Sequence, residues 1–351
     1  MKIIFKRTTP TYRNSLNTKK VMFHLTLALL IVSIISVGYY FSLGIDYGIK
    51  SILMIAVSVL FTYVCEIFYY FLLKEKNIIE TVNNSFYYVT GILFALILPI
   101  GTPYYVVIFG SIFAILIGKL IFGGFGQNIF NPALIGRAFV MMSYGDKLTT
   151  TLPNKVVDGL SSPTPTTILS GTQWMGSSEV PLSNLYLGFY KGSIGESFAI
   201  LIIILGIYLA WKKVLDWRMP VFYIGSSFII SFIAGLFHGL NPLIFALVNI
   251  GIGGLIFGGV FMVTDPVTSP SNPFGKIIFS IGAAFFTMLL RFSSNMPEGV
   301  LYSILIMNML TPMIDKYTIV PTNKNENKKL LFIIMFILVS SLLVTLVWKG
   351  A

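Results

Sequence analysis

The chain has little of what soluble enzymes use for polar chemistry. Of its 351 residues 11% are charged and 56% are hydrophobic, whereas soluble domains carry about 25% charged residues. A single cysteine, Cys65, is present. One thiol cannot form an intrachain disulfide and cannot hold an iron–sulfur cluster or a structural zinc ion. The composition therefore predicts an integral membrane protein, in which any electron transfer proceeds without a cysteine-bound metal centre.

Long apolar runs are what the chain has most of. A membrane-spanning helix needs about 20 mostly apolar residues, and several of the eleven apolar runs approach that length. The eleven runs cover residues 21–43, 51–73, 85–100, 104–122, 131–144, 197–211, 219–237, 242–263, 277–291, 298–313 and 331–348. The runs at 85–100, 131–144 and 197–211 are short, and short segments bounded by glycine or proline are often broken or tilted helices that line a site.

These runs predict an all-α polytopic membrane helix bundle. We expect about ten helices, some of them short or broken, in a bundle that covers residues 21–313. A basic segment at 1–20 precedes the bundle, and a polar linker at 314–330 follows it. Residues 331–351 would then form one additional C-terminal helix.

The basic residues are unevenly distributed along the chain. The net charge of +11 could suggest a nucleic-acid partner, but six of the 24 basic residues precede the first apolar run. If the N-terminus is placed inside the cell, sixteen basic residues fall on inner loops and about six at or near the outer side, as the positive-inside rule requires. We therefore expect a multi-pass protein of the cell membrane with a cytoplasmic N-terminus, an outward loop at 145–195 and no nucleic-acid partner. The first run is too long for a cleaved signal peptide.

Five charged residues lie within or at the ends of apolar runs, where each costs a few kcal/mol near a helix centre. They are Glu66, Lys119, Arg137, Arg291 and Glu298. For the three basic residues, a side chain that reaches from a helix end to the membrane surface is as good an explanation as a functional role. Glu66 is more central, and either a hydrogen-bonded structural role or an ion-ligand role fits it.

Asp265 is the second candidate for an ion path. It follows an apolar run, precedes Pro266, and has Thr264 and Thr268 nearby. Oxygen ligands of this kind suit a hard cation, although an aspartate that caps a helix is an equally good interpretation. His238, on a short outer loop, is expected to be solvated.

One short sequence occurs twice. Residues 120–124 (LIFGG) recur at 255–259, and each copy is followed by Asn131-Pro132 or by Asp265-Pro266. A five-residue match is weak support for an internal repeat. The glycines and prolines still predict broken helices at both places, and backbone freed there must face protein or a water-filled cavity.

Several motifs in a fixed order carry a family resemblance. The segment 123–143 is glycine-rich but lacks the Gly-Lys-Ser/Thr ending and the preceding strand of a phosphate-binding loop. The motifs are FGGFGQNIFNPALIGRAF (122–139), VDGLSSPTPTTIL (157–169), GSIGES (192–197), DWRMPV (216–221), VTDPVTSP (263–270) and PEGVLYSILIMNMLTPMID (297–315). From about residue 9 to 315 the chain resembles RnfD, a membrane component of the Rnf complex, which is an ion-translocating ferredoxin:NAD oxidoreductase. It is also similar to NqrB, a component of the sodium-pumping NADH:quinone oxidoreductase.

The resemblance implies a covalent flavin on the outward loop. In this family FMN is joined through its phosphate to a threonine hydroxyl, and the matching position here is Thr164. Pro163 stands where alanine is usual, and Thr166 where leucine is usual. A threonine hydroxyl is a weak nucleophile, so a separate flavin transferase must activate it. The resemblance also allows a second, non-covalent flavin such as riboflavin among the helices.

The resemblance implies a flavin-carrying protein of the complex that passes electrons between ferredoxin and NAD and couples this flow to Na⁺ or H⁺ translocation. The expected partners are other Rnf-complex subunits, the flavin transferase and membrane lipid. The chain is not expected to be catalytic alone, to bind a metal, or to bind NAD or ferredoxin. The alternative from another class is a non-redox transporter or channel, for which the threonine-rich loop at 156–169 would have no use.

Overall fold

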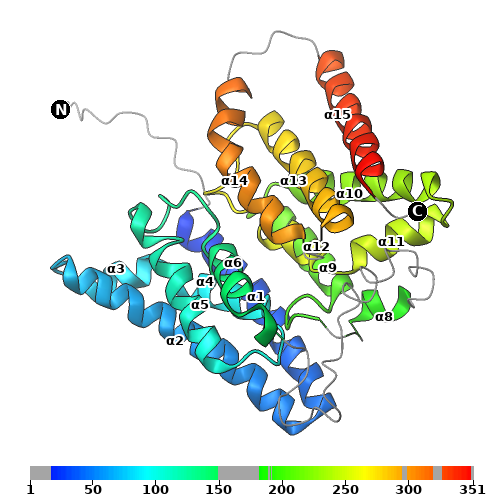
Figure 1. Cartoon of the computed structure of the whole chain (residues 1–351). Helices are drawn as coiled ribbons and strands as arrows, with labels where there is room; N and C mark the ends of the chain where they lie inside the picture. The colour runs from blue at the N-terminus through cyan, green and yellow to red at the C-terminus, as the bar shows by residue number, and fades with distance from the viewer. Residues whose placement is uncertain are drawn as a thin grey trace, which may run out of the picture.

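A computed structural model describes residues 17–148, 182–188, 190, 192–294, 299–318 and 326–348. Over these residues the protein consists of α-helices and two 3₁₀ turns, without a β-strand (Figure 1). The extended pairing found there is an isolated bridge between Pro99 and Ser193. The prediction of an all-α membrane helix bundle is confirmed.

The first half of the bundle comprises the elements up to residue 147. Its elements are α1 (Thr18–Leu43), α2 (Ile45–Leu72), α3 (Ile78–Asn84), α4 (Tyr87–Leu96), α5 (Tyr104–Leu116), η1 (Leu120–Phe122), α6 (Pro132–Tyr144) and η2 (Gly145–Lys147).

The second half begins at residue 182, within the segment 145–195 that we expected to form one long loop. Its elements are α8 (Leu182–Leu187), α9 (Ala199–Trp211), α10 (Arg218–Phe237), α11 (Pro242–Gly251), α12 (Leu255–Phe261), α13 (Pro273–Ser293) and α14 (Gly299–Thr318), and α15 (Glu326–Val347) follows it.

All eleven apolar runs fall on helices, but they differ in length. Among the described residues, six helices are long and apolar enough to cross a membrane, and α11 with α12 makes a seventh span if this pair, bent by 58°, is counted as one. The three runs that we expected to be short form α4, α6 and α9, with 10, 13 and 13 residues. The expectation that some helices are short or broken is therefore confirmed.

Three helices begin at the same local signal, an asparagine followed by proline. The side chains of Asn131, Asn241 and Asn272 each accept a hydrogen bond from a backbone N–H of the helix that follows. This bond satisfies a donor that the first turn leaves open, and proline at the first helical position has no donor to satisfy. The sequence thus fixes where α6, α11 and α13 start.

The two halves repeat one packing order. In the first half α2 packs against α4 and α5, and α5 packs against α6; in the second half α10 packs against α11 and α13, and α13 against α14. The repeated sequence at 120–124 and 255–259 does not mark this repeat. Its first copy follows α5 and ends in Gly123 and Gly124 with φ of 110° and 94°, whereas its second copy lies within α12.

Backbone hydrogen bonds tie the second half to the short helix of the first. α4 ends at Leu96, and the amides of Ile194 and Gly195 donate to the carbonyls of Leu98 and Leu96 at 3.0 and 2.7 Å. The last carbonyls of a helix have no partner within it, and in a membrane protein they must find one in the protein. The segment at 193–195 supplies those partners.

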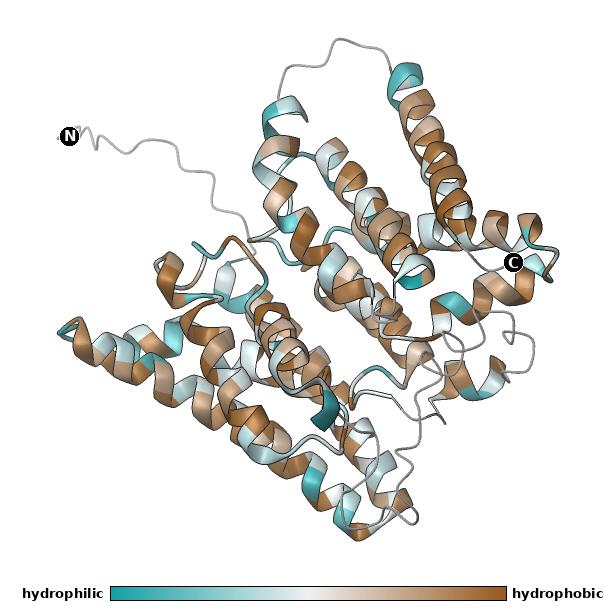
Figure 2. Cartoon of the chain, in the orientation of Figure 1, coloured by the Kyte–Doolittle hydropathy of each residue, from teal (hydrophilic) through white to brown (hydrophobic). Residues whose placement is uncertain are grey.

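The C-terminal helix α15 packs against α10 and α13. Beyond its end Trp348 is buried among aromatic rings, with ring centroids 3.9 Å from His238, 5.3 Å from Phe245 and 5.1 Å from Phe292. His238 is half-buried with its ring against Trp348, so it is less solvated than we expected. Apolar residues cover the outward faces of the long helices (Figure 2), as expected for surfaces that face lipid.

Candidate functional site

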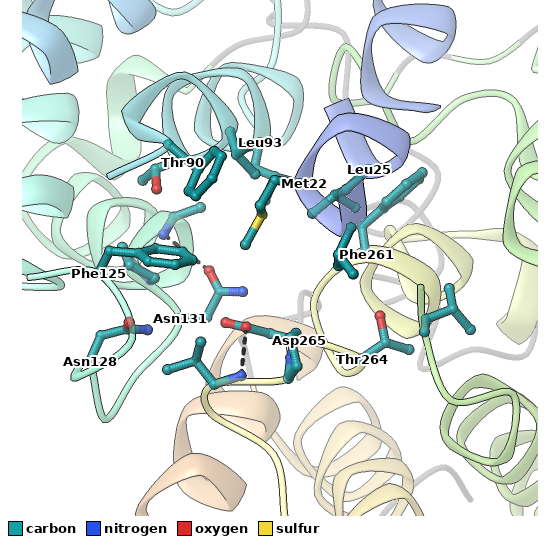
Figure 3. A pocket seen from close by; sticks show the side chains of 18 of the residues that line it. Met22, Leu25, Thr90, Leu93, Phe125, Asn128, Asn131, Phe261, Thr264 and Asp265 are labelled. Carbon is teal, nitrogen blue, oxygen red and sulfur yellow. Dashed lines mark hydrogen bonds between the residues drawn. The ribbon is translucent and has the colours of Figure 1, made fainter. Parts of the chain in front are cut away.

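A cavity with a volume of about 80 Å³ lies between the two halves (Figure 3). The start of α1, the start of α4, the loop before α6, the end of α9 and the loop after α12 contribute to its wall. The lining residues are Val21, Met22, Leu25, Ser85, Phe86, Val89, Thr90, Leu93, Lys119, Phe125, Asn128, Asn131, Pro132, Ala133, Leu209, Val214, Leu215, Phe261, Thr264, Asp265, Pro266 and Val267. The wall is mainly apolar and carries a few polar groups, which is the usual character of a small-molecule site.

The glycine-rich loop before α6 forms one wall of the cavity. Gly123, Gly124 and Gly126 have φ of 110°, 94° and 85°, a region that residues with a side chain rarely adopt. These three positions let the chain turn sharply after η1 and place Phe125 and Asn128 in the wall. The glycines of this segment therefore shape one wall of the cavity. Without side chains, they also allow a helix or a flat ring to come close to the backbone.

Asp265 projects into the cavity from the second half, and its carboxylate points toward Asn131 of the first half (Figure 3). The Asp265 carboxylate accepts a hydrogen bond from the Val267 amide at 3.1 Å. Burial raises the pKa of Asp265 above its ordinary value, and the bond from Val267 acts in the opposite direction. Asp265 thus caps a turn rather than a helix. The same side chain also faces the cavity.

Lys119 lies in the opposite wall and is paired with Glu66. Its Nζ atom is 2.7 Å from Glu66 Oε1 and donates to the Ser85 carbonyl at 2.6 Å. Both side chains are buried, with 3% and 0% of their surface exposed, so Lys119 does not extend to the membrane surface. The Lys119 ammonium also lies 5.8 Å from the ring centroid of Phe125. The two ion-path candidates thus belong to one region, Asp265 directly and Glu66 through Lys119.

The two buried arginines also do not extend to the membrane surface. Arg137 and Arg291 are 3% and 0% exposed. The Arg291 guanidinium donates to the carbonyls of Asn249 and Ile252, the second at 3.2 Å. These carbonyls lie where the chain breaks between α11 and α12, so Arg291 closes the end of a broken helix.

Asn308 is a residue of this region that the sequence did not single out. Its side-chain oxygen accepts from the Asn131 amide at 3.3 Å, and its side-chain nitrogen donates to the Thr268 carbonyl at 3.2 Å. It therefore connects the start of α6 with the loop that carries Asp265. Its place within the motif at 297–315 was visible in the sequence, but its partners, 177 and 40 residues away, were not.

Thr164, the predicted flavin acceptor, and the segment 156–171 lie outside the described residues, as does Glu298. Within the described part of the chain no group of three or more histidine, cysteine, aspartate or glutamate side chains is arranged to hold a metal ion.

Comparison with known proteins identifies the family. The sequence model described as the NQR2, RnfD, RnfE family matches residues 6–324. The chain belongs to this family. It is 37% identical over 321 residues to the D component of the proton-translocating ferredoxin:NAD(+) oxidoreductase complex of Clostridium ljungdahlii, and the match covers 88% of this chain and 92% of that protein.

Of two further family members, one is named for Na⁺ and the other for no particular ion. The chain is 36% identical over 310 residues to the D component of the Na(+)-translocating ferredoxin:NAD(+) oxidoreductase complex of Acetobacterium woodii, with the same shares of 88% and 92%. It is 32% identical over 258 residues to the D component of an ion-translocating oxidoreductase complex of Stutzerimonas stutzeri, covering 65% of this chain and 72% of that protein. Overall similarity within the NQR2, RnfD, RnfE family therefore does not choose between H⁺ and Na⁺.

Proposed function

We propose that the chain is the RnfD component of an Rnf-type complex in the cell membrane. In this role it carries flavin and passes electrons between ferredoxin and NAD, and this flow is coupled to translocation of Na⁺ or H⁺. The observation that carries the proposal is the match to the D components of two such complexes over 88% of the chain, which extends over both halves of the bundle. The partners in this role are other Rnf-complex subunits, a flavin transferase and membrane lipid.

The proposed topology has the basic N-terminal segment in the cytoplasm and the loop 145–195 outside. All parts of the chain that form the cavity wall then lie at the cytoplasmic end of the bundle: the start of α1, the end of α9 and the loop that carries Asp265. In a Cys65→Ser background, an impermeant thiol reagent on intact cells should label Ser177→Cys and not Ser271→Cys. The reverse labelling pattern would overturn this topology.

The proposed flavin on the outside is FMN, esterified through its phosphate to the Thr164 hydroxyl. The flavin ring, once bound, supplies the redox chemistry, and the protein supplies position and electrostatics. Residues before Thr164 are small or proline, which suits an accessible acceptor for a transferase. A covalent link also prevents loss of the cofactor from the outer face.

We further assign a non-covalent flavin, such as riboflavin, to the cavity. The cavity volume of about 80 Å³ is below the range of about 300–1,000 Å³ that is typical of small-molecule sites, so its walls must move apart to admit the ring. Phe86, Phe125 and Phe261 offer apolar surface to a flat ring, and the side chains of Asn128 and Asn131 offer hydrogen bonds to its polar edge. These residues would bind and orient the ring and exclude water from it.

The proposed ion path uses the same region. Asp265 offers a carboxylate on one wall, and the Glu66–Lys119 pair lies at the other. A cation or a proton that reaches Asp265 would neutralise its charge in surroundings that disfavour the ionised form. The charges of Asp265 and Glu66 would then link two events: the redox state of the bound flavin and the position of the ion would influence each other through them.

The function is tested in a strain that lacks the gene for this chain. Membranes from that strain should have lost ferredoxin-dependent reduction of NAD, and the intact gene should restore it. Full activity without this chain would contradict the assignment. Ion flux through the chain in vesicles without an electron donor would instead support a non-redox transporter or channel.

A further inference from the structure

A second, more polar pocket lies beside the cavity, between the α9–α10 hairpin and the start of α13. Its volume is about 390 Å³. It shares Val214, Leu215, Thr264 and Pro266 with the wall of the cavity. Its other lining residues include four charged side chains and the hydroxyl of Ser269.

The charged side chains of this pocket do not balance. Lys213, Arg218 and Lys276 face a single carboxylate, that of Asp216. Asp216 Oδ2 is 3.2 Å from Lys276 Nζ and 3.5 Å from an Arg218 nitrogen. Three positive charges and one negative charge leave the pocket with a net charge of +2, so the ligand that it favours is an anion.

The Ser269 hydroxyl is an independent sign of a ligand. Ser269 is 6% exposed, and its Oγ has no hydrogen-bond partner within the described part of the chain. A buried hydroxyl without a partner costs free energy, and a bound group with acceptor oxygens would remove that cost. Three basic groups and a hydroxyl donor together match a phosphate.

The position of the pocket indicates where that phosphate comes from. Trp211 ends α9 and Trp217 precedes α10, and their side chains are 76% and 54% exposed. The ammonium of Lys212 lies 4.9 Å from the ring centroid of Trp211. Exposed tryptophans between apolar helices and a basic loop are typical of the level of the lipid headgroups, and basic pockets between membrane helices bind anionic headgroups.

We propose that this pocket binds the phosphate group of an anionic phospholipid. Lys213, Arg218 and Lys276 neutralise the phosphate, Ser269 donates a hydrogen bond to it, and Trp211 and Trp217 lie at the level of the headgroup. A lipid bound here contacts residues next to Asp265 without taking part in electron transfer. The binding is a property of the chain itself and does not depend on the proposed flavin or ion path.

The test compares two neighbouring lysines, of which only Lys213 lines the pocket. The full chain in detergent is mixed with phosphatidylglycerol or with phosphatidylcholine of the same acyl chains, and bound lipid is counted by native mass spectrometry. The wild type should prefer phosphatidylglycerol. Lys213→Gln should lower that binding about fivefold, the factor expected for one lysine near a headgroup. Ser269→Ala should also lower it, whereas Lys212→Gln, outside the pocket, should lower it less than Lys213→Gln does.

A parallel set of samples with sodium phosphate distinguishes the two sources of a phosphate group. If the pocket serves lipid, phosphatidylglycerol should raise the thermal midpoint of the wild type and inorganic phosphate should not. An equal rise with inorganic phosphate, lost in Lys213→Gln, would assign the site to soluble phosphate and overturn the lipid source. Equal effects of Lys213→Gln and Lys212→Gln, or no preference for phosphatidylglycerol, would overturn the pocket itself.

Discussion

The two halves of the bundle repeat one packing order but place their buried basic residues differently. In the first half Lys119, which follows α5, meets the Glu66 carboxylate and the Ser85 carbonyl. In the second half Arg291, near the end of α13, donates to the carbonyls of Asn249 and Ile252. The α10 sequence, which occupies the place of α2, contains no acidic residue.

This difference separates two roles for a buried cation. Arg291 completes the backbone of a broken helix, and its planar fork can reach two carbonyls. Lys119 balances a carboxylate and borders the cavity, so its position can depend on other charges that enter the cavity. We infer that the buried cation of the first half, Lys119, can adjust its position, whereas that of the second half, Arg291, is fixed.

The largest expected effect comes from removing the adjustable charge. Lys119→Met leaves Glu66 buried without its partner, which should cost roughly 3–5 kcal/mol of unfolding free energy. The double variant Glu66→Gln, Lys119→Met removes both charges and should recover most of that loss. Thermal unfolding in detergent measures both variants. Equal instability of the single and the double variant would contradict the role given to this ion pair.

A smaller loss is expected in the second half. Arg291→Lys keeps the charge but replaces the fork with one ammonium, so one buried carbonyl loses its donor, at about 1–3 kcal/mol. Arg218→Lys is the matched control, because the Arg218 side chain is 37% exposed. Thermal unfolding should separate the two variants. If both behave as the wild type, Arg291 does not close the broken helix.

The effect at Asp265 concerns ion dependence rather than stability. Burial raises the pKa of Asp265, so its protonated form persists to a higher pH than usual, and a cation must compete with that proton. If Na⁺ binds there, the half-saturating Na⁺ concentration for electron transfer should fall as the pH rises through this pKa. Asp265→Asn should lower coupled electron transfer, remove this pH dependence and leave the flavin on Thr164. An unchanged pH dependence would remove Asp265 from the path.

The sequence predicted the helices well because apolar runs report directly on membrane helices. It predicted a broken helix at 255–266 but not the position of the break, which lies earlier, at Gly253 and Gly254, both with φ of 66°. It named Glu66, Lys119 and Asp265 one by one but not their common region, because Glu66 and Lys119 are 53 residues apart and Asp265 comes from the other half. Thr164 follows from family resemblance alone, since neighbouring threonines have the same hydroxyl chemistry.

The central claim is that this chain carries covalent flavin on the outward loop. The protein should be made in a host that has the flavin transferase, separated by denaturing electrophoresis, and examined for flavin fluorescence. The account predicts a fluorescent band that Thr164→Ala abolishes and that Thr166→Ala and Thr167→Ala retain, with FMN found by mass spectrometry on the peptide that contains Thr164. An unmodified 156–171 segment from cells that flavinylate other acceptors would contradict the account.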